Sequence, residues 1–362
     1  MNTDIKTYDM RGLQQAMKEL GQPAFRAKQI YEWLWYKHVD SFDKMTNLSL
    51  ALREELASKF SLTIPKLIDK QESSDGTRKY VLELSDGALV ETVGIPADAS
   101  RERLTVCFST QVGCPMECVF CATGHEGFTR NLTIGEIVDQ VYFVEEDFGR
   151  RISNVVGMGQ GEPFLNYDNV LAALRIMNDK KGLNIGARRI AVSTCGMLDG
   201  IKQFSNESEQ FTLAVSLHSA IQPIRNEIMP HVARQSLKSL RSALERYIEK
   251  TNRRVTFEYL LIQDVNDTQE DLDALIKYCR GLLCHVNLLP MNDIEGSYFA
   301  ATPQKTVKHW LDSLEKHHIE ATLRSSRGSD IAGACGQLKN KQGPINRNKN
   351  SLFFARSFSI ID

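Results

Sequence analysis

The chain contains 362 residues, of which 42% are hydrophobic and 25% are charged, as in an ordinary globular protein of two or three domains. Its 44 lysines and arginines against 45 aspartates and glutamates give a formal net charge of −1, which excludes a globally basic nucleic-acid-binding protein but not a local basic patch. No apolar run is long enough for a transmembrane helix, the N-terminus lacks signal-peptide features, and eight cysteines are too sparse for a disulfide scaffold. We therefore expect a cytoplasmic monomer without membrane association.

Residues 1–60 predict a small helical domain of three helices, the first capped by Asp9 and the third spanning residues 48–60. In the middle helix, the apolar side chains that share one face are those of Phe25, Ile30, Trp33 and Leu34. The basic side chains on its other side are those of Arg26, Lys28 and Lys37. Burial statistics favour core packing for Trp33 and Trp35. The basic side chains also allow a second interpretation, in which residues 1–60 form an accessory domain that binds the phosphates of RNA.

Residues 61–99 predict a β-hairpin linker. Tyr80, Leu82 and Leu84 alternate with polar residues, as on a half-buried strand, and Asp86-Gly87 supplies a turn. The second strand of this hairpin carries Glu91.

Residues 100–338 alternate apolar β-type runs with amphipathic helical segments. The predicted strands lie at 104–109, 152–158, 189–194, 211–218, 255–262, 285–290 and 321–325, and the predicted helices at 133–147, 167–178, 236–250, 269–281 and 304–317. Such alternation is typical of parallel strands joined by crossover helices. About six units predict an α/β fold with a partial (βα)6 barrel rather than a complete eight-fold barrel. Residues 339–362 are predicted to form a C-terminal tail.

Three closely spaced cysteines follow the first predicted strand of this barrel. Cys114, Cys118 and Cys121 form the pattern Cys-x-x-x-Cys-x-x-Cys, and thiolates are soft ligands suited to zinc or to iron–sulfur clusters. A zinc site would take His125 as its fourth ligand. A four-iron cluster ordinarily has four cysteine ligands, so that three would leave one iron open for chemistry. Phe120 completes the pattern Cys-x-x-x-Cys-x-aromatic-Cys, which resembles the signature of the radical S-adenosylmethionine (SAM) enzymes.

Further segments narrow the resemblance. The segments VETVGIPADASRERLTVCFSTQVGC, GMGQGEPFLNYDNV, VSTCG, LAVSLHS and SSRGSDIAGACGQL resemble the RlmN/Cfr family of adenosine methyltransferases. The resemblance implies one [4Fe-4S] cluster held by Cys114, Cys118 and Cys121, and two molecules of SAM per turnover. It further implies methylation of adenine at carbon-2, or at carbon-8 in the Cfr resistance branch. Ile95-Pro96 and Arg327-Gly328 look more like the carbon-2 branch.

The resemblance also implies residue roles. Cys335 would receive a methyl group, whose carbon then joins the RNA to the protein, and Cys107 would attack Cys335 to release the methylated base. Glu91 would act as the general base. The implied contacts to SAM are Gly161, Glu162, Ser193, Ser216, Leu217, His218 and Asn292.

The family's substrates are an adenosine of large-subunit (23S) ribosomal RNA and, for some members, a transfer-RNA adenosine. A flavodoxin-like electron donor is also implied. The chain departs from the family at Gln160, where an apolar residue is common, and at Cys195, where a serine is common. Two other hypotheses remain open: a radical SAM enzyme acting on a small molecule or peptide, and a zinc-stabilised RNA-binding protein. Arg26, Lys28, Arg188 and Arg189 are candidates for a local basic patch.

Overall fold

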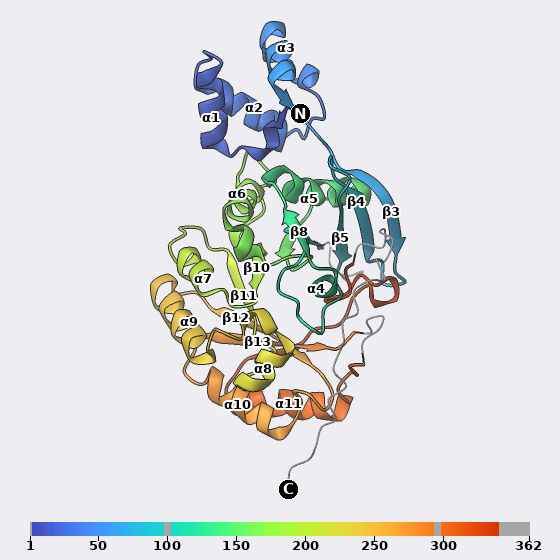
Figure 1. Cartoon of the computed structure of the whole chain (residues 1–362), viewed down its shortest axis with the longest axis vertical. Helices are drawn as coiled ribbons and strands as arrows, with labels where there is room; N and C mark the ends of the chain where they lie inside the picture. The colour runs from blue at the N-terminus through green and yellow to red at the C-terminus, as the bar shows by residue number, and fades with distance from the viewer. Residues whose placement is uncertain (1, 98–102, 293–297, 340–362) are drawn as a thin grey trace.

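The fold is built on one ten-stranded sheet (Figure 1). The computed structural model describes residues 2–97, 103–292 and 298–339. In their order across the sheet, the strands are β14 (Ala321–Leu323), β13 (Cys284–Pro290), β12 (Val255–Leu261), β11 (Thr212–Ser216), β10 (Ile190–Thr194), β9 (Asn154–Gly157), β6 (Leu104–Cys107), β5 (Leu89–Pro96), β4 (Arg78–Glu83) and β3 (Lys66–Glu72). Because β14 and β3 lie at opposite edges, the sheet is open.

The strands from β6 to β14 form the parallel part of the sheet. The helices that connect them in turn are α5 (Ile134–Phe148), α6 (Tyr167–Asn178), α7 (Leu198–Phe204), α9 (Leu237–Thr251), α10 (Gln269–Cys279) and α11 (Gln304–Lys316). A short additional helix, α8 (Gln222–Ile228), precedes α9. The apolar side chains of the central strands are buried, as expected of parallel strands covered by helices. The predicted partial (βα)6 barrel is confirmed.

One crossover helix was absent from the sequence prediction. Helix α7 has only seven residues, too few to show a clear 3.6-residue period. It also contains Gly200, a poor helix former. A Cβ atom at Gly200 would lie 2.5 Å from the Phe164 side chain, so close packing of this helix against the neighbouring segment requires the glycine.

The predicted hairpin is confirmed and proves to be part of the main sheet. Strands β4 and β5 pair antiparallel, with Gly87 (φ +83°) in the turn between them. Strand β5 also pairs antiparallel with β6, in a register that sets Val93 opposite Cys107. Strand β3, which the sequence did not predict, pairs with β4 at the edge. This arrangement sets the strand that carries Glu91 beside the strand that carries Cys107.

The N-terminal helices α1 (Met10–Glu19), α2 (Phe25–Trp35) and α3 (Leu50–Lys59) lie at one end of the molecule (Figure 1). The Asp9 side chain accepts a hydrogen bond from the Gly12 amide, as the predicted cap requires. Trp33 and Trp35 are buried, which confirms their core packing. Phe25, at the start of α2, is 53% exposed although it shares the apolar face of the helix with buried residues, and the Arg26 guanidinium lies over its ring, 4.9 Å from the centroid.

Buried charges join these helices to the barrel. The Lys6 ammonium pairs with the Asp139 carboxylate of α5, and both side chains are almost fully buried. The other Asp139 oxygen lies 3.3 Å from His38 Nε2, and the His38 ring stacks on Tyr142 of the same helix. Removing one partner of a buried ion pair is costly, so these contacts hold the N-terminal helices against α5.

In the described part of the chain, no helix combines the length and apolar character needed to cross a bilayer. Apart from Lys339, the predicted C-terminal tail lies outside the described residues.

Candidate active site

The three predicted cluster ligands lie on one loop at the carboxyl end of β6. Cys114 directly follows β7 (Gln111–Gly113), and Cys121 directly precedes helix α4 (Ala122–Glu126). Strand β7 pairs with β8 (Phe128–Asn131), and this pairing requires a glycine at 113: its φ is +74°, and a Cβ there would lie 2.0 Å from the Gly127 carbonyl oxygen. The loop is therefore folded back on itself.

The surroundings of these cysteines fit an iron–sulfur cluster. Cys114, Met116, Cys118, Phe120 and Cys121 line one hollow of about 480 Å³, and they belong to an apolar cluster that includes Met229. Burial raises the pKa of the Cys114 thiol to about 12 and that of Cys121 to about 11. Coordination to a cationic metal centre would offset this cost, because a coordinating thiol is deprotonated.

The histidine of the alternative zinc site points elsewhere. His125 is exposed, and its Nε2 lies 3.1 Å from the Val119 carbonyl oxygen. Within residues 2–97, 103–292 and 298–339, no group of three or more His, Cys, Asp or Glu side chains converges on a single metal ion. His125 is therefore not placed as a fourth ligand beside the three cysteines.

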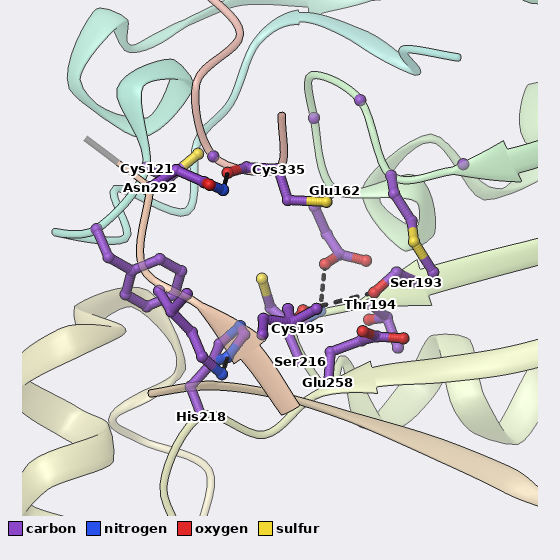
Figure 2. Close-up of a pocket in the computed structure, with 18 of the residues that line it drawn as sticks. Cys121, Glu162, Ser193, Thr194, Cys195, Ser216, His218, Glu258, Asn292 and Cys335 are labelled. Carbon is purple, nitrogen blue, oxygen red and sulfur yellow. Dashed lines mark hydrogen bonds between the residues drawn. The ribbon is translucent and has the colours of Figure 1, made fainter. Parts of the chain in front are cut away.

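A larger cavity of about 790 Å³, open to solvent, adjoins the cysteine loop at the carboxyl ends of the barrel strands. Of the sequence-predicted residues, those that line it are Cys121, Gly161, Glu162, Ser193, Ser216, His218, Asn292 and Cys335. Figure 2 shows that the Cys335 sulfur and the Glu162 carboxylate point into this cavity, with Ser216 and Glu258 on the opposite wall.

Glu162 is held as a buried carboxylate at the inner wall. Its Oε1 accepts a hydrogen bond from the Phe164 amide at 3.0 Å and its Oε2 accepts one from the Cys195 amide at 2.6 Å. Burial raises the pKa of Glu162, and these two bonds oppose that shift. Gly161 has φ +103°, and a Cβ there would lie 2.7 Å from the Gln111 side chain. The turn that places Glu162 at this wall therefore requires a glycine at 161.

His218 is a neutral side chain in this cavity. Its Nδ1 accepts a hydrogen bond from the Leu260 amide at 3.0 Å, which leaves the proton on Nε2. Burial lowers its pKa to about 3, with a further contribution from the Arg225 charge. Its ring also packs edge-on against Phe120 of the cysteine loop, at 4.6 Å between centroids. His218 therefore offers a fixed N–H donor.

Leu217 is the predicted SAM contact that does not line the cavity. Its side chain is fully buried in the main core, and its amide donates to the Glu258 carbonyl oxygen at 3.0 Å. Ser193 and Ser216, by contrast, face each other with 3.4 Å between their hydroxyl oxygens. The structure brings the polar members of the predicted set together and leaves the apolar one in the core.

The segment that carries Cys335 is fastened to the cysteine loop. The Ala122 amide donates to the Gly336 carbonyl oxygen at 2.7 Å, and the Thr123 hydroxyl donates to that of Leu338 at 2.6 Å. The Asn292 side-chain amide donates to the Cys335 carbonyl oxygen at 3.1 Å. Cys335 itself is exposed at the cavity wall. Short backbone contacts thus hold the sulfur at the mouth of the cavity.

Cys107 lies behind this wall. It is buried at the end of β6, in a small apolar cluster with Val93 and Leu338 against which Met158 packs. Met158 lines the cavity, whereas Cys107 is not among the lining residues. Both Cys107 and Cys335 are free thiols. Burial raises the pKa of the Cys107 thiol to about 12, so a neighbouring positive charge is needed to favour its thiolate.

Glu91 is covered rather than open to the cavity. Its side chain is fully buried on β5, with Oε1 3.3 Å from the Lys79 ammonium and Oε2 accepting a hydrogen bond from the Lys339 amide at 2.7 Å. Burial raises the pKa of Glu91 to about 7, and the Lys79 charge opposes this shift. The predicted base therefore lies under the segment that carries Cys335.

Four further residues belong to this region; the sequence named Cys195 only as a departure from the family, and the other three were not predicted. Glu258 lines the cavity, Lys79 pairs with Glu91, Arg324 lies beside Glu258, and Cys195 lines the space between Glu162 and the cysteine loop. A signal was available for one of them: Glu258 is the charged residue of a largely apolar strand, and such residues are seldom buried without a partner.

The departure at Gln160 has a structural role. This side chain is fully buried, and its Oε1 accepts a hydrogen bond from the Glu91 amide at 3.1 Å. An apolar residue here could not make that bond. Of the candidate basic residues, Arg188 and Arg189 directly precede β10, at the opposite end of the strands from the cavity.

Comparison with known proteins agrees with this geometry. Residues 3–62 match the family model described as the ribosomal RNA large subunit methyltransferase N-terminal domain, and residues 108–279 match the radical SAM superfamily. A solved structure of a radical SAM methyltransferase from Sphaerobacter thermophilus superimposes with a TM-score of 0.86 at 40% identity, covering 92% of this chain and 98% of that one.

Curated relatives extend over nearly the whole chain. The probable dual-specificity RNA methyltransferase RlmN of Clostridium perfringens (strain SM101 / Type A) is 45% identical over 337 residues, which cover 93% of this chain and 96% of that protein. The protein of the same description from Staphylococcus aureus (strain Newman) is 46% identical, with 92% of each chain covered. The chain therefore belongs to the RlmN family of radical SAM RNA methyltransferases.

Proposed function

We propose that this chain methylates carbon-2 of an adenine in 23S ribosomal RNA, with transfer RNA as a second substrate. The observation that carries the proposal is a pair of free thiols close to Met158: Cys335 lines the same cavity as Met158, and Cys107 lies in the apolar cluster against which Met158 packs. The description of the relatives as dual-specificity enzymes supports two RNA substrates. Methylation at carbon-8 is the alternative, and a small-molecule or peptide substrate would leave Cys107 and Cys335 without a role.

The chain's residues suit a relay of the methyl group. When bound, the cluster and two molecules of SAM per turnover would supply the methyl group and the radical chemistry that turns it into a reactive carbon on the Cys335 sulfur. Cys114, Cys118 and Cys121 would hold the cluster, and Glu162, His218 and the facing serines would hold SAM. We expect a flavodoxin-like protein to supply the electrons.

The release step requires both thiols. Once the methylene carbon joins the Cys335 sulfur to the adenine ring, Glu91 would accept the displaced ring proton. The Cys107 thiolate would then attack the Cys335 sulfur, so that an S–S bond forms and the S–CH2 bond breaks. The electron pair of the broken S–CH2 bond passes to the methylene carbon, which takes up a proton and becomes the methyl group. The protein is left with a disulfide that an external dithiol must reduce.

The burial of Glu91 implies that a conformational change precedes proton transfer. Because the Lys339 amide occupies the Glu91 carboxylate, an adenine can reach the base only after the segment that carries Cys335 has shifted. Docking of the RNA would supply that shift. The exposed Phe25, Lys28, Tyr36 and Lys37 of the N-terminal helices combine aromatic and cationic side chains suited to an unpaired RNA segment.

The test of the proposal is the Cys107→Ala variant, purified anaerobically and incubated with 23S RNA, SAM and a reductant. We expect RNA covalently bound to the protein, lost on ribonuclease treatment, because the thiol that would release the base is gone. Mass analysis of the digested adduct then names the nucleotide and the carbon. A variant with a full complement of iron that turns over normally and forms no adduct would refute the relay, and a carbon-8 adduct would select the alternative.

The pH dependence of methylation tests Glu91. A base with a pKa of about 7 must lose its proton to act, so the single-turnover rate should fall as the pH drops below 7. Lys79→Met removes the charge that lowers this pKa, so the fall should begin about one unit higher. Lys70→Met, which removes a partly exposed lysine paired with Asp147, is the control. The same profile in the Lys79→Met variant and the control would exclude Glu91 as the titrating base.

A further inference from the structure

Arg324 follows β14, the last strand of the open barrel, and its guanidinium turns toward the cavity wall. Its Nη1 lies 3.6 Å from Glu258 Oε2 and 3.8 Å from the Met158 sulfur. Glu258 and Met158 both line the cavity that Cys335 faces (Figure 2 shows Glu258 and Cys335). Met158 also packs against the cluster that contains Cys107. Arg324 thus contacts a residue that lines the Cys335 cavity and packs against the Cys107 cluster.

The Arg324 charge is only partly neutralised by Glu258. The Asn287 amide donates to Glu258 Oε1 at 2.9 Å, whereas Oε2 accepts no hydrogen bond from the described residues. At 3.6 Å the guanidinium is an ion-pair partner of Oε2 but lies beyond hydrogen-bond distance. The strongest arginine–carboxylate pairs have two parallel N–H···O hydrogen bonds, which this pair lacks. The loose contact leaves the positive charge to act on the sulfur atoms as well.

Each thiol depends on this charge in the same way. Burial raises the pKa of the Cys107 thiol, and partial loss of solvation at the cavity wall raises that of the Cys335 thiol. For both thiols the Arg324 charge opposes the shift. The Glu258 charge acts in the opposite direction on Cys335. The other ionisable side chains that line the cavity are Cys121, Glu162, Cys195 and His218. His218 is neutral, and Arg324 is the cation whose charge acts on both Cys107 and Cys335.

We propose that Arg324 is a positioning residue that favours the thiolate forms of Cys335 and Cys107, with Glu258 limiting its field. This inference rests on the proposed function, because the relay needs Cys335 as a thiolate to take up the methyl group and Cys107 as a thiolate to release the base. A thiolate, not a thiol, is the nucleophile in both steps. One cation that acts on both sulfur atoms would serve both steps in succession.

The test measures thiol reactivity without RNA. The holoenzyme is kept anaerobic and reduced with a dithiol, and the rate at which iodoacetamide alkylates Cys335 is followed by peptide mass spectrometry across a pH series. Any fraction of Cys335 that already carries a methyl group is counted in the same spectra and excluded. Cys335 is accessible from the cavity mouth, so its alkylation reports on its thiolate fraction.

Variants at Arg324 and Glu258 should change the alkylation rate of Cys335 in opposite directions. Arg324→Met keeps the stem but not the charge, and should slow alkylation near neutral pH by about ten-fold, as for a pKa rise of about one unit. Arg324→Lys keeps the charge and should stay within about three-fold of the wild type. Glu258→Gln removes the opposing charge and should speed alkylation by about three-fold. Arg254→Met, which removes a surface ion pair with Glu320, should leave the rate unchanged.

The outcomes separate this proposal from the relay itself. If Arg324→Met alkylates like the wild type, or if Glu258→Gln changes the rate in the same direction as Arg324→Met, the electrostatic role of Arg324 is refuted. Slowing in Arg324→Lys equal to that in Arg324→Met would also refute it, since the charge would not matter. The relay is judged independently by the Cys107→Ala adduct, so either proposal can fail while the other stands.

Discussion

Replacement of Cys335 by alanine should abolish RNA methylation while the iron content stays that of the wild type. Cys335 is exposed at the cavity wall and lies on a segment fastened to helix α4 through Gly336 and Leu338 backbone carbonyls. Neither hydrogen bond uses the sulfur, so the variant keeps the fold of the segment and loses only the methyl acceptor. Methyl transfer to RNA and methylation of the protein are measured separately, with labelled SAM.

A matched control is Cys284→Ser, because Cys284 is a partly buried thiol at the start of β13, outside the cavity lining. It should methylate RNA at the wild-type rate. Residual methylation of RNA by Cys335→Ala, above the background of a reaction without reductant, would show that the methyl group reaches the base without passing through this sulfur. The relay would then be wrong, although the family assignment would stand.

Loss of one cysteine ligand should remove the iron–sulfur cluster. Cys118→Ala should lose most of its iron and sulfide together with all methylation, because three thiolates are the whole of the predicted protein ligand set and two cannot hold the cluster securely. Iron and sulfide are measured on anaerobically purified protein, and the visible absorbance of the cluster is recorded on the same sample.

A substitution at Cys195 is the matched control for Cys118→Ala. It lines the same hollow as Cys118 but lies outside the Cys-x-x-x-Cys-x-x-Cys pattern, so Cys195→Ser should retain the iron that Cys118→Ala loses. Equal loss of iron from both variants would mean that four cysteines, not three, hold the metal. Zinc without iron in the wild-type protein would contradict the cluster altogether.

Much of the fold was predictable because its signals are local. The alternation of apolar strands with amphipathic helices predicted the open barrel, and the Asp86-Gly87 turn predicted the hairpin. Helix α7 was missed because seven residues with an internal glycine show no clear period. Phe25 is exposed although it shares a helix face with buried residues. Helical spacing indicates which residues share a face, but it does not show which part of that face is buried.

The amino-acid sequence alone predicts the type of chemistry, through three cysteines around Phe120, the segments that resemble a known family, and two further cysteines with a glutamate. How these groups are arranged around one another follows from the packing of the chain. The fold buries Glu91 against Lys79 and under the Lys339 amide, and it places Arg324 beside Met158. The reason is physical: ligand motifs are short and contiguous, whereas burial and charge pairing join residues far apart in the chain, and only the packed strands bring those residues together.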